Sequence, residues 1–249
     1  MVYFVGAGPG AEDLITVRGA DLLREAELII YAGSLVNEKL LLGAKAGCKV
    51  MNSAEMTLEQ VAEAMKAAER QIVVRLHTGD PSIYGAIREQ MDELDRFGID
   101  YEVVPGVSSF CAAAAALKAE YTLPGVSQSV IITRMEGRTA VPPKEDIALF
   151  AAHQATIVLF LSAGILKEAG ARLIDGGYSP DTPAAIVYKA SWPDEKVFRT
   201  TISGLYETAH QNKITKTALI LVGHFLGGTY ERSKLYDPSF AHEFREASK

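Results

Sequence analysis

Cysteine is scarce in this sequence, which has only Cys48 and Cys111 among 249 residues. Two cysteines do not provide the disulfide framework of a small secreted protein, so we expect reduced structural thiols. No cysteine and histidine residues have the spacing of a zinc site. The sequence therefore predicts neither a disulfide nor a bound metal.

Runs of basic residues and long apolar segments are also missing. The net charge is −6 and lysine and arginine do not cluster, which argues against a nucleic-acid partner. The longest apolar run, near residues 110–117, is far shorter than the ~20 residues of a membrane span. We expect this sequence to begin directly with a strand. We expect a cytoplasmic globular protein that binds no membrane.

Several catalytic patterns are absent as well. The sequence has no Ser-His-Asp order, no pair of catalytic carboxylates and no phosphate-binding loop. Hydrolysis and phosphoryl transfer are therefore disfavoured. The hydrophobic content of 48% nevertheless supplies a core for one large or two small domains.

Apolar strands alternate with helices in the first half of the chain. We expect strands at residues 2–5, 28–31, 72–77 and 101–104. We expect helices at residues 14–25, from Thr57 on, at 81–97 and from Ser108 or Ser109 to Leu117. Buried strands that alternate with helices indicate a parallel sheet. The fold class is therefore α/β, with an N-terminal domain at residues 1–118.

The pattern breaks at residues 119–128, where Pro124-Gly125 lies in a segment with neither periodicity. We take this segment as a linker to a second α/β domain at 129–228, followed by a polar tail at 229–249. Its strands are expected at 129–134, 156–161, 184–188, 196–202 and 217–222, and its helices at 147–152 and 166–175. The strand after Trp192-Pro193 suggests an antiparallel hairpin, so the C-terminal sheet is predicted to be mixed.

The turn after the strand at 72–77 combines several unusual residues. Asp80 suits a helix N-cap and Pro81 the first helical position. Capping does not explain why the strand end also carries Arg75, His77 and a Thr-Gly pair. We therefore expect this turn to bind a ligand, beyond its role in the backbone.

The glycine loop at residues 6–10 admits more than one interpretation. A glycine turn after a first strand is typical of dinucleotide-binding proteins. Pro9, however, removes an N–H donor, and the second strand ends in Ala32-Gly33 rather than in an acidic residue. Nicotinamide binding is thus disfavoured, while a plain tight turn and a loop that approaches another ligand both stay open. In open α/β sheets such ligands bind at the carboxyl ends of the strands.

Four motifs resemble the signatures of the tetrapyrrole (corrin/porphyrin) methylases. They are Val-Gly-Ala-Gly-Pro-Gly at 5–10, Leu-Ile-Thr-Val-Arg-Gly at 14–19, His-Thr-Gly-Asp-Pro at 77–81 and Val-Pro-Gly-Val-Ser-Ser at 104–109. Three further motifs, at 31–36, 133–142 and 188–196, resemble the branch that methylates C-11 of precorrin-4 or cobalt-precorrin-4. The resemblance extends from residue 1 to about residue 226.

The resemblance implies a two-domain enzyme, usually a homodimer, that binds S-adenosylmethionine in the cleft between the domains. It would methylate a corrin precursor, precorrin-4 or cobalt-precorrin-4, at C-11 in cobalamin biosynthesis and give the precorrin-5 form. By motif position, the implied cofactor contacts are Pro9, Gly79, Asp80, Tyr84, Ser108, Ser109, Leu161, Tyr188 and Ala218. Some relatives that methylate uroporphyrinogen carry an acidic residue just after the tyrosine of the second strand, whereas Ala32 and Gly33 follow Tyr31 here. This departure disfavours uroporphyrinogen and removes an obvious base.

A substrate with acetate and propionate groups would be docked by cationic side chains. The candidates are Arg134, Arg138, Lys189, Arg18 and Arg75; the alternative for each is a solvated surface charge. His77 is the candidate for contacting substrate or relaying a proton, with a structural hydrogen-bonding role as its alternative. Three other functions stay open: methylation of another ring carbon, non-catalytic binding of the cofactor or a tetrapyrrole, and a nicotinamide-dependent oxidoreductase.

Overall fold

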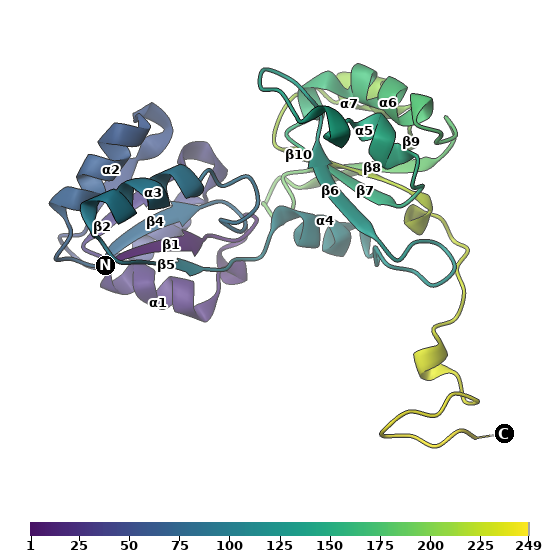
Figure 1. The fold of residues 1–249 in the computed structure, drawn as a ribbon, viewed down its shortest axis with the longest axis horizontal. Coiled ribbons are helices and arrows are strands. Elements are labelled where there is room, and N and C mark those ends of the chain that lie inside the picture. Colours follow the sequence, from purple (N-terminus) through teal and green to yellow (C-terminus); the bar gives the residue numbers. More distant parts are fainter. Residues whose placement is uncertain (249) are drawn as a thin grey trace. The chain divides into compact units, whose positions relative to one another are not determined.

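A computed structural model describes residues 1–248 of the chain, which divides into two compact α/β units (Figure 1). The first unit comprises Met1–Ala113 and, from much later in the chain, Lys189–Glu195. The second comprises Ala114–Tyr188 and the chain from Lys196 on. The segment predicted as a linker, 119–128, thus lies within the second unit.

The first unit is built on a five-stranded, wholly parallel sheet, as predicted. Its strands are β1 (Val2–Gly6), β2 (Leu28–Tyr31), β3 (Lys49–Asn52), β4 (Val73–His77) and β5 (Tyr101–Val104), in the order β3-β2-β4-β1-β5. β3 was not predicted, because the side chains of this edge strand are mostly exposed and its residues lack an apolar pattern. All five carboxyl ends lie at one edge of the sheet.

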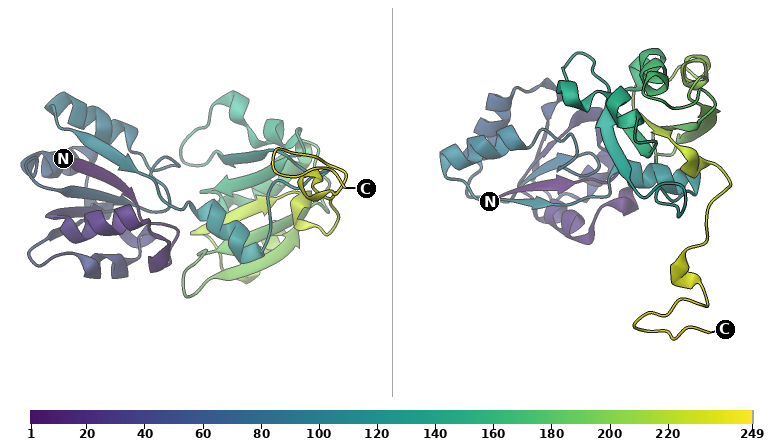
Figure 2. Two further views of the ribbon diagram at one scale, coloured as in Figure 1. Left: turned by 90° about the horizontal axis from the view of Figure 1, so that it is seen from below. Right: turned by 45° about the vertical axis from the view of Figure 1, so that its right-hand side comes forward.

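Helices cover both faces of this sheet (Figure 2). One apolar cluster joins the sheet to α2 (Leu58–Ala67) and α3 (Arg88–Phe97), and another joins the opposite face to α1 (Val17–Glu25). Thr16 caps α1 as expected, since its hydroxyl accepts a hydrogen bond from Gly19 N at 3.1 Å. Thr57 and Gln60 form a capping box at the start of α2.

The predicted start of the next helix was wrong. α3 begins at Arg88 rather than after Asp80, and Asp80 caps a local turn, in which its carboxylate accepts a hydrogen bond from Ser82 N at 2.9 Å. Tyr84 and Ala86 have φ angles of 56° and 49°, which no helix tolerates. This left-handed stretch separates the turn from α3.

The second unit contains a mixed five-stranded sheet, again as predicted. Its strands are β6 (Val130–Arg134), β7 (Thr156–Phe160), β8 (Pro183–Tyr188), β9 (Lys196–Thr201) and β10 (Ala218–Val222), in the order β6-β7-β10-β8-β9. Only β6 and β7 are parallel, and the predicted hairpin is the antiparallel pair β8 and β9. Helices α5 (Ile147–Ala151), α6 (Leu166–Asp175) and α7 (Leu205–Gln211) share its core. The sequence analysis missed α7, which has seven residues.

Helix α4 (Ser109–Leu117) starts where predicted, and the division between the units falls within it. Short 3₁₀ segments lie at Glu12–Leu14, Gly33–Leu35, Glu38–Gly43, Ser53–Glu55, Pro143–Glu145, Ala163–Ile165, His224–Leu226 and Lys234–Tyr236. Both cysteines are free thiols. Within residues 1–248, no helix has the length and apolar character that a membrane crossing requires.

Candidate functional site

Three loops of the first unit meet beyond the carboxyl ends of β4, β1 and β5, which are neighbours in the sheet. Gly8 and Gly79 exchange backbone hydrogen bonds, with N–O distances of 3.3 and 2.8 Å, and Ala7 N donates to His77 O at 2.7 Å. The glycine loop is thereby tied to the turn that the sequence analysis singled out. This edge is where an open α/β sheet binds its ligands.

Three glycines, Gly6, Gly79 and Gly106, pack backbone against backbone, and we call them the glycine junction. A Cβ atom at Gly6 would lie 2.6 Å from Cα of Gly106 and from the carbonyl oxygen of Gly79. A Cβ at Gly106 would lie 2.7 Å from Cα of Gly6 and would also overlap the Gly79 carbonyl. Because backbone atoms cannot rotate away, only glycine fits at positions 6 and 106. The junction holds the three loops at a fixed spacing.

Asp80 ties the junction together through its carboxylate. One oxygen accepts hydrogen bonds from the backbone and hydroxyl of Ser82, and the other accepts from Gly106 N at 2.8 Å. Partial burial raises the pKa of Asp80, but the hydrogen bonds from Ser82 and Gly106 outweigh it and leave the pKa below its usual value. The group is therefore an anion at neutral pH, held between two loops.

The start of α4 lies next to this turn. Ser108 is buried, Ser109 is half-buried, and a Cβ at Gly79 would meet Ser109 N at 3.5 Å, an ordinary contact. Tyr84 is 46% exposed and has a left-handed backbone. Such strained residues gather at functional sites. The structure thus brings together Pro9, Gly79, Asp80, Ser108 and Ser109, the first-unit cofactor candidates, with Tyr84 on the turn beside them.

His77 and Arg75 point into the unit, because alternate residues of β4 share one face. His77 is 3% exposed, its ring centroid lies 6.0 Å from that of Phe4, and its Nε2 has no hydrogen-bond partner among residues 1–248. Burial, assisted by the charge of Arg75, lowers the pKa of His77 to about 3. The imidazole is therefore neutral at pH 7, which does not favour a role as a proton donor.

Arg75 contributes to the interior of the unit. Its Nε donates to Gln90 Oε1 at 2.9 Å and its Nη1 to the carbonyl oxygen of Ile30 at 3.2 Å. Burial lowers the pKa of Arg75 to about 10, which still leaves it charged. A buried guanidinium with these partners is not available to dock a carboxylate, so this geometry speaks against the predicted substrate contact.

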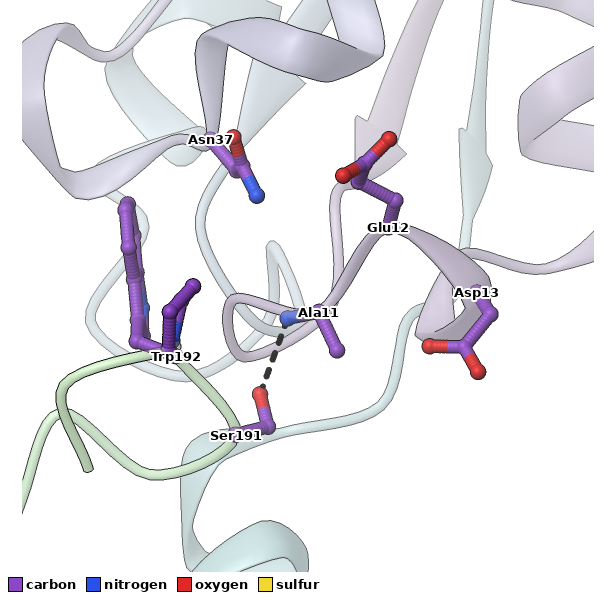
Figure 3. Close-up of a pocket in the computed structure, with 7 residues that line it drawn as sticks. Ala11, Glu12, Asp13, Asn37, Ser191 and Trp192 are labelled. Carbon is purple, nitrogen blue, oxygen red and sulfur yellow. Dashed lines mark hydrogen bonds between the residues drawn. The ribbon is translucent and has the colours of Figure 1, made fainter.

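The segment Lys189–Glu195 lies on the glycine loop, which the sequence analysis did not foresee. Trp192 Nε1 donates to the carbonyl oxygen of Pro9 at 2.8 Å, and Ala11 N donates to Ser191 Oγ at 3.0 Å (Figure 3). A cavity of about 340 Å³ adjoins this contact; it is lined by Ala11, Glu12, Asp13, Asn37, Ser191, Trp192 and Pro193. The one sequence feature that could have drawn attention to this segment is that Trp192 is the only tryptophan.

The second-unit cofactor candidates form one row. Ala218 pairs with Tyr188 across β10 and β8. Ile220 pairs with Leu159 across β10 and β7, so in the same antiparallel register Ala218 comes opposite Leu161, just past the end of β7. Leu161 is 71% exposed and has a φ of 52°. The exposed Leu161 side chain therefore provides an apolar surface at the end of β7.

The remaining cationic candidates differ in their surroundings. Arg134 donates to the carbonyl oxygens of Thr139 and Ala140 at 3.1 and 2.6 Å, so it organises the loop that presents the exposed Arg138. Arg18 pairs with Glu102 on the surface, with an N–O distance of 2.6 Å, and Lys189 Nζ lies 2.6 Å from Asp194. Only Arg138 is presented at a loop tip. No three histidine, cysteine or acidic side chains within residues 1–248 are placed to hold a metal.

Comparison with known proteins identifies the family of this chain. The family model of the tetrapyrrole (corrin/porphyrin) methylases matches residues 1–206. The cobalt-precorrin-4 C(11)-methyltransferase of Methanocaldococcus jannaschii is 53% identical over 251 residues, which cover 100% of this chain and 97% of that protein. The precorrin-4 C(11)-methyltransferase of Mycobacterium tuberculosis is 48% identical over 90% of this chain and 91% of its own length.

Solved structures show the same relationship. A cobalt-precorrin-4 methyltransferase superposes with a TM-score of 0.89 at 49% identity, over 91% of this chain and 96% of that one. Uroporphyrin-III C-methyltransferase from Thermus thermophilus, solved with S-adenosylhomocysteine, superposes with a TM-score of 0.76 at 27% identity, over 91% of this chain and 93% of that one. With its parallel sheet, its mixed sheet and the motifs at their edges, the chain belongs to the tetrapyrrole methylase family.

Proposed function

We propose that this protein transfers the methyl group of S-adenosylmethionine to C-11 of precorrin-4 or cobalt-precorrin-4, giving the precorrin-5 form in cobalamin biosynthesis. The observation that carries the proposal is the 53% identity, over the whole chain, to a relative named for this reaction. The segment Tyr31-Ala32 supports it further, since the acid expected in relatives that act on uroporphyrinogen is absent.

The cofactor is proposed to be held by Pro9, Gly79, Asp80, Tyr84, Ser108 and Ser109 from the first unit and by Leu161, Tyr188 and Ala218 from the second. The residues fit such a group: the glycine junction holds the three loops together at the edge of the sheet, Asp80 is an anion, and Leu161 offers an apolar surface. That the cofactor binds in a cleft between the domains is what the resemblance implies, and it is part of the proposal only.

Bound S-adenosylmethionine supplies an electrophilic methyl group on a sulfonium, so the protein mainly has to orient the two reactants. Orientation can contribute ~7–11 kcal/mol to lowering a barrier, whereas one general acid or base typically gives about 10²–10⁴-fold. Asp80 would face the cationic part of the donor, and the glycine junction sets the spacing of the loops around Asp80. His77, neutral and buried with a low pKa, stays a candidate for a hydrogen bond to substrate rather than for moving a proton.

The substrate carboxylates are proposed to be docked by exposed cations, with Arg138 first among them. Arg134 would act by holding the loop of Arg138, and Lys189 and Arg18 by their positive charge. Charge-assisted bonds of this kind orient a polycarboxylate while leaving its ring carbons free. Lys189 and Arg18 already have acidic partners and would have to exchange them.

The test is to incubate the purified protein with labelled S-adenosylmethionine and either metal-free or cobalt-containing precorrin-4. We expect label in at least one tetrapyrrole, over more than one turnover, with the new methyl group at C-11 by NMR. Label at another carbon would establish a different ring methylase. No turnover, with S-adenosylhomocysteine still bound in calorimetry, would establish a binding protein, and binding of NAD instead would indicate an oxidoreductase.

The resemblance also supports a homodimer and a cytoplasmic location, and both belong to the proposal. Light scattering on the purified protein tests the first: a mass near twice 26.9 kDa is expected, and a monomer at micromolar concentration would contradict it.

A further inference from the structure

Trp192 contacts the glycine loop both through a hydrogen bond and through close packing. Its Nε1–H bond to the Pro9 carbonyl joins residues 183 positions apart. On the same loop, Asn37 Nδ2 donates to the Gly10 carbonyl at 2.8 Å, and Ala11 N donates to Ser191. Three successive residues of the glycine loop thus each make a hydrogen bond to a side chain from elsewhere in the unit.

The indole also fills the space beside Gly10. A Cβ atom at Gly10 would lie 2.8 Å from Cγ of Trp192 and would overlap Nε1 and Cδ1 still more closely. Real Cβ atoms essentially never approach a ring so closely, so the glycine permits the indole to lie against the backbone. The glycine loop and Trp192 are therefore fitted to one another.

The segment that carries Trp192 is itself held in a defined shape. Lys189 and Ser191 have φ angles of 48° and 68°, and Ser191 N donates to Glu195 Oε2 at 2.6 Å. Lys189 Nζ pairs with Asp194 at 2.6 Å and lies 5.7 Å from the Trp192 ring centroid. Strained backbone held by these contacts presents the indole in one orientation.

We infer that Trp192 is a positioning residue for the cofactor site: through its bond to Pro9 O and its packing on Gly10, it holds the glycine loop in the arrangement that binds S-adenosylmethionine. This inference rests on the proposed function and adds to it a residue that acts through Pro9. It also gives Lys189 a role in orienting the indole.

The test compares W192F, which keeps an aromatic ring but loses the N–H donor, with W192A, which loses both. One net hydrogen bond is worth about 0.5–1.5 kcal/mol, so W192F should raise the Kd for S-adenosylhomocysteine about 2- to 13-fold. W192A should raise it further, by at least about tenfold. In turnover assays, KM for S-adenosylmethionine should rise while kcat at saturating cofactor stays within about threefold, because Trp192 is not a catalytic residue.

A double-mutant cycle separates positioning from folding. Gly10→Ala should weaken cofactor binding more in the wild type than in W192A, where the ring that its Cβ would meet is gone. Tyr206→Phe, which removes one O–H from an exposed aromatic on α7, is the matched control and should leave the Kd unchanged. Thermal unfolding of each variant monitors folding, and W192F keeps the test valid if W192A does not fold.

Equal cofactor affinity in wild type and W192F, or strict additivity of Gly10→Ala and W192A, would overturn the inference and leave the proposed function intact. A wild-type protein that does not bind S-adenosylhomocysteine would overturn both. Because Trp192 is the only tryptophan, its fluorescence on cofactor titration is a second readout, and we expect the emission to change on binding.

Discussion

Replacing Gly106 by alanine should disrupt the junction of the three loops. The new Cβ would lie 2.7 Å from Cα of Gly6 and overlap the carbonyl oxygen of Gly79, whereas ordinary contacts begin near 3.4 Å. Both neighbours are backbone atoms, so the loops have to separate by about an ångström, most of all at the Gly79 carbonyl oxygen. Overpacking of a rigid site costs about 1–3 kcal/mol, and we expect the upper end. A displacement of that size near reacting groups can cost ~10²-fold in rate.

Two measurements test this prediction. Denaturation followed by the fluorescence of Trp192 reports on the first unit, to which that segment belongs, and calorimetry with S-adenosylhomocysteine reports on the site. Gly43→Ala is the matched control, because a Cβ there meets nothing within 4 Å, and it should change stability by less than about 0.5 kcal/mol. Wild-type stability and affinity in Gly106→Ala would refute the reasoning that the junction requires glycine.

Three further predictions concern charged and titrating groups. His77→Phe should lessen the loss of stability in acid: the folded pKa of about 3 lies below the ordinary value of about 6.5, so stability is complete above pH 6.5 and falls as pH drops toward 3. The difference between the folded and ordinary pKa values of His77 corresponds to about 4–5 kcal/mol of wild-type stability that is lost in acid. Parallel pH profiles of the unfolding midpoint in wild type and His77→Phe would contradict the prediction. Asp80→Asn should weaken S-adenosylhomocysteine binding about tenfold in calorimetry, because the anion between Ser82 and Gly106 is lost, and unchanged affinity would remove Asp80 from the site. Arg138→Ala should raise the KM for the tetrapyrrole more than the Kd for the cofactor in parallel titrations, and an unchanged KM would exclude it from docking.

The strands and helices could be predicted only in part, and single elements show why. β4 and β10 are apolar runs bounded by turn residues, so their periodicity and length identify them. β3 carries mostly exposed side chains, and nothing in its residues distinguishes it from a loop. The start of α3 was predicted too early because Asp80-Pro81 is a good local cap. No residue pattern indicates that Tyr84 has a left-handed backbone, which ends the turn before α3 begins.

The candidate site shows the same division between local and long-range causes. Glycine and proline motifs at strand ends are local, so the loops around Pro9, Gly79 and Ser108 could be singled out from residues alone. Whether a cationic side chain at a strand end faces solvent depends on the long-range packing around it, which the local sequence does not show. For this reason Arg75 was predicted as a docking group, although its side chain lies buried against Gln90.

The sequence by itself determined the α/β class, most strands and helices, and the loops at their ends, because apolar periodicity and turn chemistry act over a few residues. Only the tertiary structure decided which of these loops meet. Gly6, Gly79 and Gly106 come together because β4, β1 and β5 are neighbours in the sheet, and Trp192 reaches Pro9 across 183 positions of the chain. Contacts of this kind depend on how strands pair and how segments pack, which no window of neighbouring residues specifies.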